Sequence, residues 1–340
     1  MDPSTAPSKN ATKRSAVAIV GAGSIGVGWA IVFAQTGHTV RLYDADAARL
    51  SVALNELSSK LDELAEFGLL ASTKAEVFVR ITAATTIATA LADTIHVQEC
   101  APESLDLKRA LFAELDRLSP PDAVLASSTS FIPASRFAAD LAGRARCLVV
   151  HPANPPYLMR LSEVVPAPFT AEDAVDRTMR LLQSLGMGPV RLGAEIDGFV
   201  YNRLQGSLLR EAYALVRDGI ATAPEIDRIV RDGLGLRWSV LGPFQTADLN
   251  TRGGIVAHAK RMGPAYQRMA EAPGRNQPWS ADLVAKVATE LSGSPGAGTW
   301  SEGVARRDRA LMALLRERQR RIGEDPAAGT GGQSDAREGQ

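Results

Sequence analysis

The chain has 340 residues, 45% of them hydrophobic, which is enough for two domains with separate cores. Its 38 basic side chains equal its 38 acidic ones, so no net field favours nucleic acid or an anionic membrane, and we expect a small-molecule partner. The two cysteines, Cys100 and Cys147, lie in apolar runs. This argues against a disulfide framework or a cysteine-based zinc site, and we expect no metal and a reducing compartment, the cytoplasm.

Both ends of the chain are polar. Residues 1–14 contain no apolar segment of the kind that signal peptides carry, so we expect a disordered tail there. Residues 323–340 are rich in glycine, alanine and serine and predict a second disordered tail. Between the tails, no stretch is long and apolar enough to span a membrane.

The first ordered unit is a strand, a glycine loop and a helix. The apolar strand Ala16–Val20 runs directly into Gly21-Ala-Gly23-Ser24-Ile25-Gly26, and the residues that follow have helical character. Gly21 permits a tight turn, and Gly23 lets the backbone approach a pyrophosphate. Gly26 allows the helix to lie close to the sheet, with its N-terminus facing the phosphates. This arrangement predicts a dinucleotide-binding unit.

An acidic residue follows the second strand. Thr39–Tyr43 predicts that strand, and it ends at Asp44, where a carboxylate would accept hydrogen bonds from an adenosine ribose. An acid at this point favours NAD over NADP. The alternative is a glycine-rich turn with an ordinary helix-capping aspartate.

Residues 45–68 predict a long helix, and residues 71–79 a second helical piece. Leucines recur every three or four residues in the long helix, which indicates core packing. They are Leu50, Leu54, Leu57, Leu61 and Leu64. The other face of the helix shows no basic cluster for a phosphorylated carrier such as coenzyme A.

Two chemically useful side chains end successive strands. Ala123–Thr129 predicts a strand that ends at Ser130, and Cys147–Val150 predicts one that delivers His151, with a helix over residues 133–141 between them. A right-handed crossover places both ends at the edge of the sheet that carries the glycine loop. Three motifs therefore meet at one edge. Capping and turn chemistry is the alternative for the serines.

A carboxylate can face the histidine. Prolines stiffen the loop after His151, and Leu161–Val165 predicts another strand, which contains Glu163. If this strand folds back beside the first, Glu163 fixes the tautomer of the imidazole and favours its protonated form. Such a pair is a candidate general base. A structural histidine and glutamate are the alternative.

Another predicted strand, Thr94–Gln98, precedes a helix over residues 104–118. Spacing alone makes Glu103 a favourable charge near the helix N-terminus and Lys108 a solvated side chain. His96 lies within the apolar strand and is expected to be a core residue rather than a ligand.

Strands disappear after a further helix over residues 171–185 and a short strand near Val190. The remaining chain predicts helices only, over residues 197–219, 224–233, 242–249, 255–269, 280–291 and 301–322. We expect a Rossmann-type α/β domain with a doubly wound, mainly parallel sheet over residues 15–196, and an all-α domain over residues 197–322. Asn202 is locally unfavourable in its helix, so it either faces solvent or has a use.

Five motifs together closely resemble the 3-hydroxyacyl-CoA dehydrogenase superfamily. They are the glycine loop with Asp44, Val97–Lys108, Ser127-Ser-Thr-Ser130, His151-Pro-Ala-Asn154-Pro-Pro and Gly198–Gln205. The runs Gln98–Glu103 and Gly233–Ser239 look most like the lambda-crystallin branch, which is known for L-gulonate 3-dehydrogenase activity. The acyl-CoA enzymes usually carry asparagine where this chain and the lambda-crystallin branch have Ser128.

The resemblance implies a role for each matching residue. His151 is the general base, Glu163 is its partner, and Ser130, Asn154 and Asn202 bind or orient the substrate. The NAD site takes Gly21, Gly23, Ser24, Ile25, Gly26, Asp44, Glu103 and Lys108. Arg160, Arg203 and Arg237 are open candidates for binding a substrate carboxylate.

We therefore predict an NAD-dependent dehydrogenase of a small L-3-hydroxy acid that forms a homodimer through its C-terminal helices. A short-chain L-3-hydroxyacyl-CoA dehydrogenase and an L-carnitine dehydrogenase are alternatives. A third alternative, of another class, is a non-catalytic NAD-binding structural protein.

Overall fold

The computed structural model describes residues 15–271, 277–292 and 299–324. The predicted tail over residues 1–14 lies outside these ranges, as does the other tail except for residues 323 and 324, which end the last helix. The chain divides into two compact units. The first contains the residues up to Tyr201 and those from Arg306, and the second contains Asn202–Ala305.

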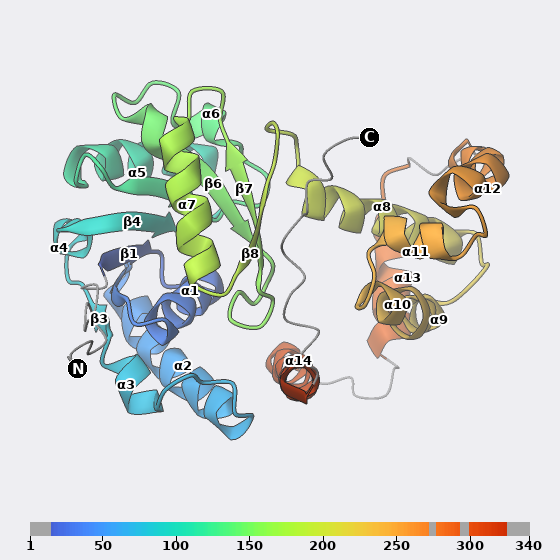
Figure 1. Ribbon diagram of the computed structural model, residues 1–340, viewed down its shortest axis with the longest axis horizontal. Helices are drawn as coiled ribbons and strands as arrows, with labels where there is room; N and C mark the ends of the chain where they lie inside the picture. The colour runs from blue at the N-terminus through green and yellow to red at the C-terminus, as the bar shows by residue number, and fades with distance from the viewer. Residues whose placement is uncertain (1–14, 272–276, 293–298, 325–340) are drawn as a thin grey trace, which may run out of the picture. The chain divides into compact units, whose positions relative to one another are not determined.

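The first unit is built on one eight-stranded sheet with the order β3-β2-β1-β4-β5-β6-β7-β8 (Figure 1). Neighbouring strands are parallel except β6 and β7, which are antiparallel. The strands are Ala16–Val20 (β1), Thr39–Tyr43 (β2), Ile81–Ala83 (β3), Thr94–Glu99 (β4), Val124–Ser127 (β5), Cys147–Pro152 (β6), Leu161–Pro166 (β7) and Gly188–Arg191 (β8). The predicted doubly wound, mainly parallel sheet is confirmed.

Helices cover both faces of the sheet (Figure 1). Side chains alternate along β1, so that Val17 and Ile19 join one buried cluster while Ala18 and Val20 join another. The first cluster includes side chains of α1, α2, α3 and α7, and the second includes side chains of α4, α5 and α6. These helices are Ser24–Gln35 (α1), Ala47–Glu66 (α2), Lys74–Phe78 (α3), Ile87–Leu91 (α4), Leu105–Leu118 (α5), Ala134–Phe137 (α6) and Glu172–Ser184 (α7).

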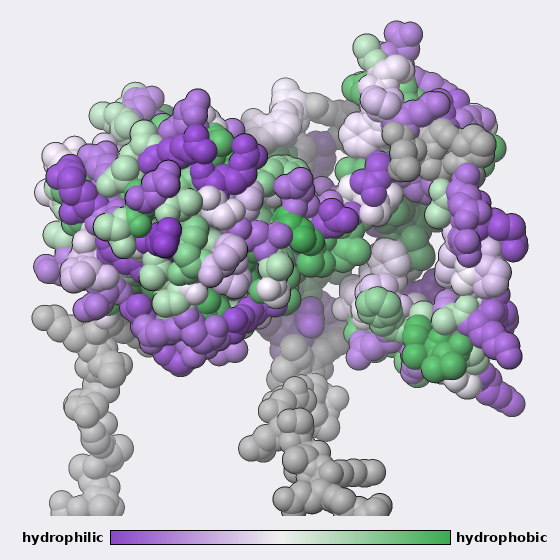
Figure 2. Space-filling view, turned by 90° about the horizontal axis from the view of Figure 1, so that it is seen from above, coloured by the Kyte–Doolittle hydropathy of each residue, from purple (hydrophilic) through white to green (hydrophobic). Residues whose placement is uncertain are grey.

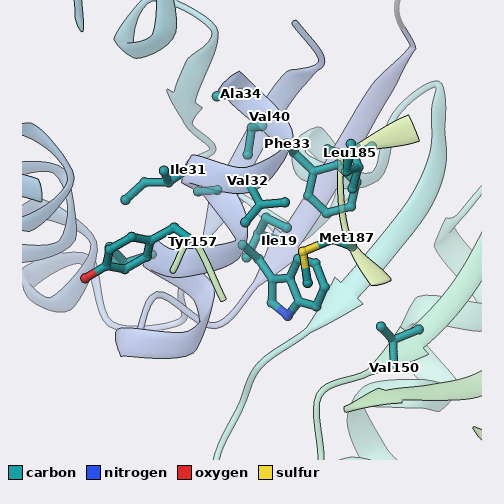
Figure 3. Close-up of a cluster of buried hydrophobic side chains, with 14 of the residues drawn as sticks. Ile19, Ile31, Val32, Phe33, Ala34, Val40, Val150, Tyr157, Leu185 and Met187 are labelled. Atoms are coloured by element: carbon teal, nitrogen blue, oxygen red, sulfur yellow. The ribbon is translucent and has the colours of Figure 1, made fainter. Parts of the chain in front are cut away.

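Helix α1 is almost entirely buried, and its side chains from Ile31 to Ala34 lie in the centre of the first cluster (Figure 3). In the same view the hydroxyl of Tyr157 points away from the other labelled side chains. That hydroxyl donates to Asp308 Oδ2 at 2.9 Å. The ring of Tyr157 therefore packs in the core, and its hydroxyl bonds to the last helix, α14 (Trp300–Glu324).

Part of α14 belongs to the first unit, which corrects the predicted extent of the helical domain to residue 322. Lys60 Nζ lies 3.4 Å from the buried Asp308, and Arg309 forms a two-pronged ion pair with Glu66. Met312 is fully buried in the first cluster. The apolar periodicity predicted the helix correctly, but it could not show which domain the apolar face covers.

The boundaries of several short elements differ from prediction. Strand β3 and helix α4 were not predicted, because three and five residues are too few to show a period. Helix α6 ends at Phe137 rather than at residue 141, although Ala138 and Leu141 also pack on the second cluster. Helix α3 begins after Thr73, which forms a capping box with Glu76, and spans five residues.

The second unit consists of helices, as predicted. They are α8 (Phe199–Arg217, which begins in the first unit), α9 (Ala223–Ile229), α10 (Leu236–Trp238), α11 (Pro243–Leu249), α12 (Gly254–Ala270), α13 (Ala281–Ser292) and the start of α14. A π-helical stretch, Val230–Gly235, joins α9 to α10 and was not foreseen. Apolar side chains also reach the protein surface (Figure 2). None of the helices within the described ranges has the length and apolar character needed to cross a bilayer.

His96 is a core residue, as predicted: it is 1% exposed, and its Nε2 lies 3.0 Å from Gln98 Oε1. Burial lowers its pKa from 6.5 to about 4. Between these values the unfolded chain binds the proton and the folded chain does not, so stability falls as the pH falls. We expect this residue to contribute a slope of about 1.4 kcal/mol per pH unit over that interval.

The measurement is chemical unfolding of the wild type and of His96→Gln at several pH values between 6.5 and 5. The free energy of unfolding should change less with pH in the variant than in the wild type, whatever the stability of the variant at neutral pH. Equal slopes in the two proteins would contradict the assignment of a neutral, buried imidazole.

Candidate active site

The glycine loop has the geometry that a pyrophosphate requires. Gly21 has φ +106°, which favours glycine, and a Cβ on Gly26 would lie 1.9 Å from the Gly21 carbonyl oxygen. A Cβ on Gly23, by contrast, would meet no heavy atom of the described residues within 4 Å. Helix α1 begins at Ser24 and continues with Ile25, and no side chain within the described residues caps it. Its first backbone N–H groups are therefore available to an anion.

Asp44 follows β2 and lies against this loop. Its Oδ2 accepts a hydrogen bond of 2.7 Å from the Ala22 N–H, and its Oδ1 accepts one of 2.9 Å from the Asp46 N–H. The two backbone donors fix the carboxylate at the carboxyl edge of the sheet, next to the predicted pyrophosphate loop. The residues present thus suit NAD: a glycine cradle, an open helix N-terminus and a positioned acid.

Glu103 joins two loops at the same edge. Its carboxylate accepts hydrogen bonds from the Thr129 hydroxyl and, at 3.0 Å, from the Phe131 N–H. It is therefore more than a favourable charge before α5, because it holds the turn that contains Ser130. Its direct contact with NAD stays a prediction.

Lys108 does not lie on a solvated face. It is 1% exposed, and its Nζ lies 3.0 Å from both carboxylate oxygens of the fully buried Glu99. The Ser127 hydroxyl donates to the same carboxylate, and the Thr129 N–H donates to Ser127 Oγ at 3.2 Å. Sequence reasoning missed this network, although the available signal was a glutamate and a lysine within one strand–helix unit. Whether Lys108 also contacts NAD stays a prediction.

Ser128 lies in a polar cluster beneath the edge. The indole Nε1 of the buried Trp29 donates to Ser128 Oγ at 3.1 Å, and Gln98 Nε2 donates to it at 2.7 Å. Cys100 Sγ lies 3.3 Å from the same oxygen. The hydroxyl that distinguishes this chain from the usual acyl-CoA pattern is thus part of the packing between α1 and β4.

His151 and Glu163 form a pair, as their predicted positions allowed. Strand β7 runs antiparallel to β6 with His151 directly opposite Glu163, and Nδ1 lies 2.8 Å from Glu163 Oε2. Glu163 Oε1 accepts hydrogen bonds of 2.8 Å from the N–H groups of Val200 and Tyr201, in the first turn of α8. Both members of the pair are buried.

The carboxylate of Glu163 is held in its charged form. Burial raises its pKa, but hydrogen bonds from His151 and from the backbone of Tyr201 and Val200 outweigh that effect and lower it. A charged Glu163 places the ring proton of neutral His151 on Nδ1 and leaves the lone pair on Nε2.

The loop after His151 packs on α1. A Cβ on Gly28 would lie 2.7 Å from Pro156 Cδ, so the glycine permits this close approach. Asn154 is exposed in this loop and precedes a cis peptide bond to Pro155. Asn154 therefore lies on the segment between the two members of the His151–Glu163 pair.

The remaining predicted site residues are placed as follows. Ser130 follows β5, which is parallel to β6, so it shares the edge of His151. Asn202 follows Tyr201 in α8 and begins the second unit, which also contains Arg203 and Arg237. Arg160 donates to the Leu185 carbonyl oxygen at the end of α7 at 3.3 Å, and burial lowers its pKa.

Comparison with known proteins agrees with this geometry. Residues 16–196 match the 3-hydroxyacyl-CoA dehydrogenase NAD binding domain, and residues 198–295 match the C-terminal domain of the same family. Lambda-crystallin of Oryctolagus cuniculus is 39% identical over 273 residues, covering 80% of this chain and 85% of the relative. L-carnitine dehydrogenase of Streptomyces griseus is 39% identical over 306 residues, covering 88% and 89%.

The structure of 5-formyl-3-hydroxy-2-methylpyridine 4-carboxylic acid 5-dehydrogenase, an NAD-dependent dismutase, is also similar. It has a TM-score of 0.76 and 27% identity, covering 89% of this chain and 98% of that chain. Fold, glycine cradle and relatives together define an NAD-dependent hydroxy acid dehydrogenase. The chain belongs to the 3-hydroxyacyl-CoA dehydrogenase superfamily, in the lambda-crystallin branch.

Proposed function

We propose that this dehydrogenase oxidises the 3-hydroxyl of a small L-3-hydroxy acid such as L-gulonate, with His151 as the general base and Glu163 as its partner. The observation that carries the proposal is the buried 2.8 Å contact between His151 Nδ1 and Glu163 Oε2 at the edge that carries the glycine loop. A base in this position needs one ring nitrogen oriented and the other free for the substrate.

The reaction converts a secondary alcohol to a ketone. His151 Nε2 takes the hydroxyl proton, and the negative charge of Glu163 stabilises the imidazolium that forms. Ser130 and Asn202 hydrogen-bond the substrate oxygen, and Asn154 contributes from the loop after His151. Bound NAD would supply the hydride acceptor: the carbon that bears the hydroxyl would lose a hydride, and with it two electrons, to the cofactor.

The charges on the early helices favour a small acid over a CoA thioester. Arg49, Lys60 and Lys74, on α2 and α3, are each paired with a carboxylate. These cations are already compensated, so they offer little attraction to the phosphates of coenzyme A. Arg160 is bonded at the end of α7, so we assign the substrate carboxylate to Arg203 or Arg237.

L-Carnitine is the second candidate substrate, because the L-carnitine dehydrogenase of S. griseus matches this chain over more residues than rabbit lambda-crystallin does, at the same identity. A carnitine site needs an aromatic or acidic group for the quaternary ammonium. Two aromatic rings of α8 lie near the proposed base: the centroids of Phe199 and Tyr201 are 5.6 and 6.1 Å from that of His151. Phe199 is fully buried and Tyr201 is half-buried, so Tyr201 is the aromatic candidate.

We also propose a homodimer through the helices of the second unit. Several of their large apolar side chains are exposed, including Phe244 at 80% and Val256 at 77%. Exposed apolar groups in such number favour association.

The two free thiols, Cys100 and Cys147, support the proposed cytoplasmic location.

The test is NADH formation with L-gulonate, L-3-hydroxybutyrate, L-carnitine and L-3-hydroxybutyryl-CoA, each with NAD and with NADP. Turnover of L-gulonate or 3-hydroxybutyrate with NAD is the expected result. Turnover of carnitine alone, or of the CoA thioester alone, would replace the proposed substrate with that compound. No turnover of any of the four compounds, with NAD bound, would favour the alternative of a non-catalytic NAD-binding structural protein.

A further inference from the structure

A guanidinium lies beside the acid that is predicted to bind the adenosine ribose. Arg49, in the first turn of α2, donates from Nε to the Ala22 carbonyl oxygen at 2.8 Å. The N–H of the same residue donates to Asp44 Oδ2 at 2.7 Å. One residue of the glycine loop thus binds both Asp44 and Arg49. In dinucleotide-binding folds, a basic group near the acid that binds the ribose accommodates the 2′-phosphate of NADP.

Glu56, two helical turns further along α2, occupies the rest of that guanidinium. Arg49 NH1 and NH2 donate to Glu56 Oε1 and Oε2 at 3.0 and 2.6 Å. Nε is already bonded to Ala22, so each of the three nitrogens has a partner. Asp44 and Asp46 lie close enough to add to the electrostatic compensation of Arg49. The side chains of Arg49 and Glu56 are 29% and 43% exposed, and so exposed a pair contributes little to stability.

We propose that Glu56 is a specificity-determining residue for the cofactor, acting through Arg49. Glu56 holds the guanidinium against the glycine loop and compensates its charge. The place next to the adenosine ribose then carries the carboxylate of Asp44, and no uncompensated cation of Arg49 is available to a 2′-phosphate. The chain therefore contains a latent NADP-binding group that one acidic side chain keeps engaged. Releasing that group improves NADP binding without improving NAD binding, because only NADP carries the extra phosphate.

The experiment measures the dissociation constants of NADH and NADPH by calorimetry, which requires no turnover and so does not depend on the substrate. In Glu56→Ala, the dissociation constant of NADPH should fall about tenfold, while that of NADH changes less than about twofold. Glu56→Gln, which keeps the shape and removes the charge, should shift the NADPH value in the same direction and serves if the alanine variant does not fold.

Two control variants test whether the gain in NADPH binding requires Arg49 and is specific to Glu56. Replacing Arg49 by alanine in the Glu56→Ala background should abolish the gain, because the gain requires the guanidinium. Asp62→Ala removes an acid from the same helix, paired with Lys74 at 2.7 Å, and should leave the NADPH to NADH ratio unchanged. The proposal is overturned if neither Glu56 variant changes the ratio, if the double variant keeps the gain, or if Asp62→Ala reproduces it.

Discussion

His151→Ala is expected to lower kcat for the preferred hydroxy acid by at least about a hundredfold, since general base catalysis contributes factors of that order or more. The imidazole is opposite Glu163 in the strand register and is oriented by it, so alanine leaves no group to take the hydroxyl proton. NADH binding should change little, because the glycine loop follows β1 and Asp44 follows β2, whereas His151 lies in β6.

Steady-state kinetics and NADH titration of the same preparation make this test. His38→Ala is a matched control, because it also removes an imidazole but lies just before β2, at the opposite edge of the sheet. It should keep wild-type kcat. Near-normal turnover in His151→Ala would remove His151 from the mechanism, and equal losses in both variants would indicate a general effect on folding.

Asp44→Ala is expected to raise the Michaelis constant for NAD by about tenfold to a hundredfold, the range for losing hydrogen bonds to a charged group. It should also narrow the preference for NAD over NADP, since the carboxylate that repels a 2′-phosphate is gone. Part of the effect comes from the glycine loop, because the same carboxylate binds the Ala22 N–H.

The ratio of kcat/KM for NAD to that for NADP is the quantity to measure. Asp46→Ala provides the comparison: it removes the neighbouring carboxylate, which caps α2 by accepting from the Ala48 N–H. That variant should lose stability and change the cofactor ratio much less than Asp44→Ala does, because Asp46 adds only the smallest part of the charge that compensates Arg49. An unchanged ratio in Asp44→Ala would show that Asp44 does not select the cofactor.

The sequence alone predicted those parts of the site that depend on the direction of each strand. The apolar runs that end at Asp44, Ser130 and His151 are parallel strands, and parallel strands bring their carboxyl ends to one edge. The proline-rich loop returns the chain as an antiparallel strand, which brings Glu163 opposite His151. These predictions succeeded because they required only the direction of each strand.

Other features depend on distances between elements that no local pattern records. Lys108 was expected on a solvated face from its helical position, yet it pairs with Glu99 in the interior. The last helix was assigned to the helical domain, yet Asp308 binds Tyr157 in the first unit. The periodicity of a helix shows that one face is apolar, but it cannot identify the surface that this face covers.

In the proposed reaction a hydride leaves carbon 3 of a small hydroxy acid. The most direct measurement uses L-gulonate deuterated at that carbon, with NAD and the wild-type enzyme, followed by mass spectrometry of the isolated NADH. The proposed reaction should give NADH that carries one deuterium and a product oxidised at carbon 3. Unlabelled NADH, or no NADH from gulonate while only L-carnitine or the CoA thioester is turned over, would contradict this reaction.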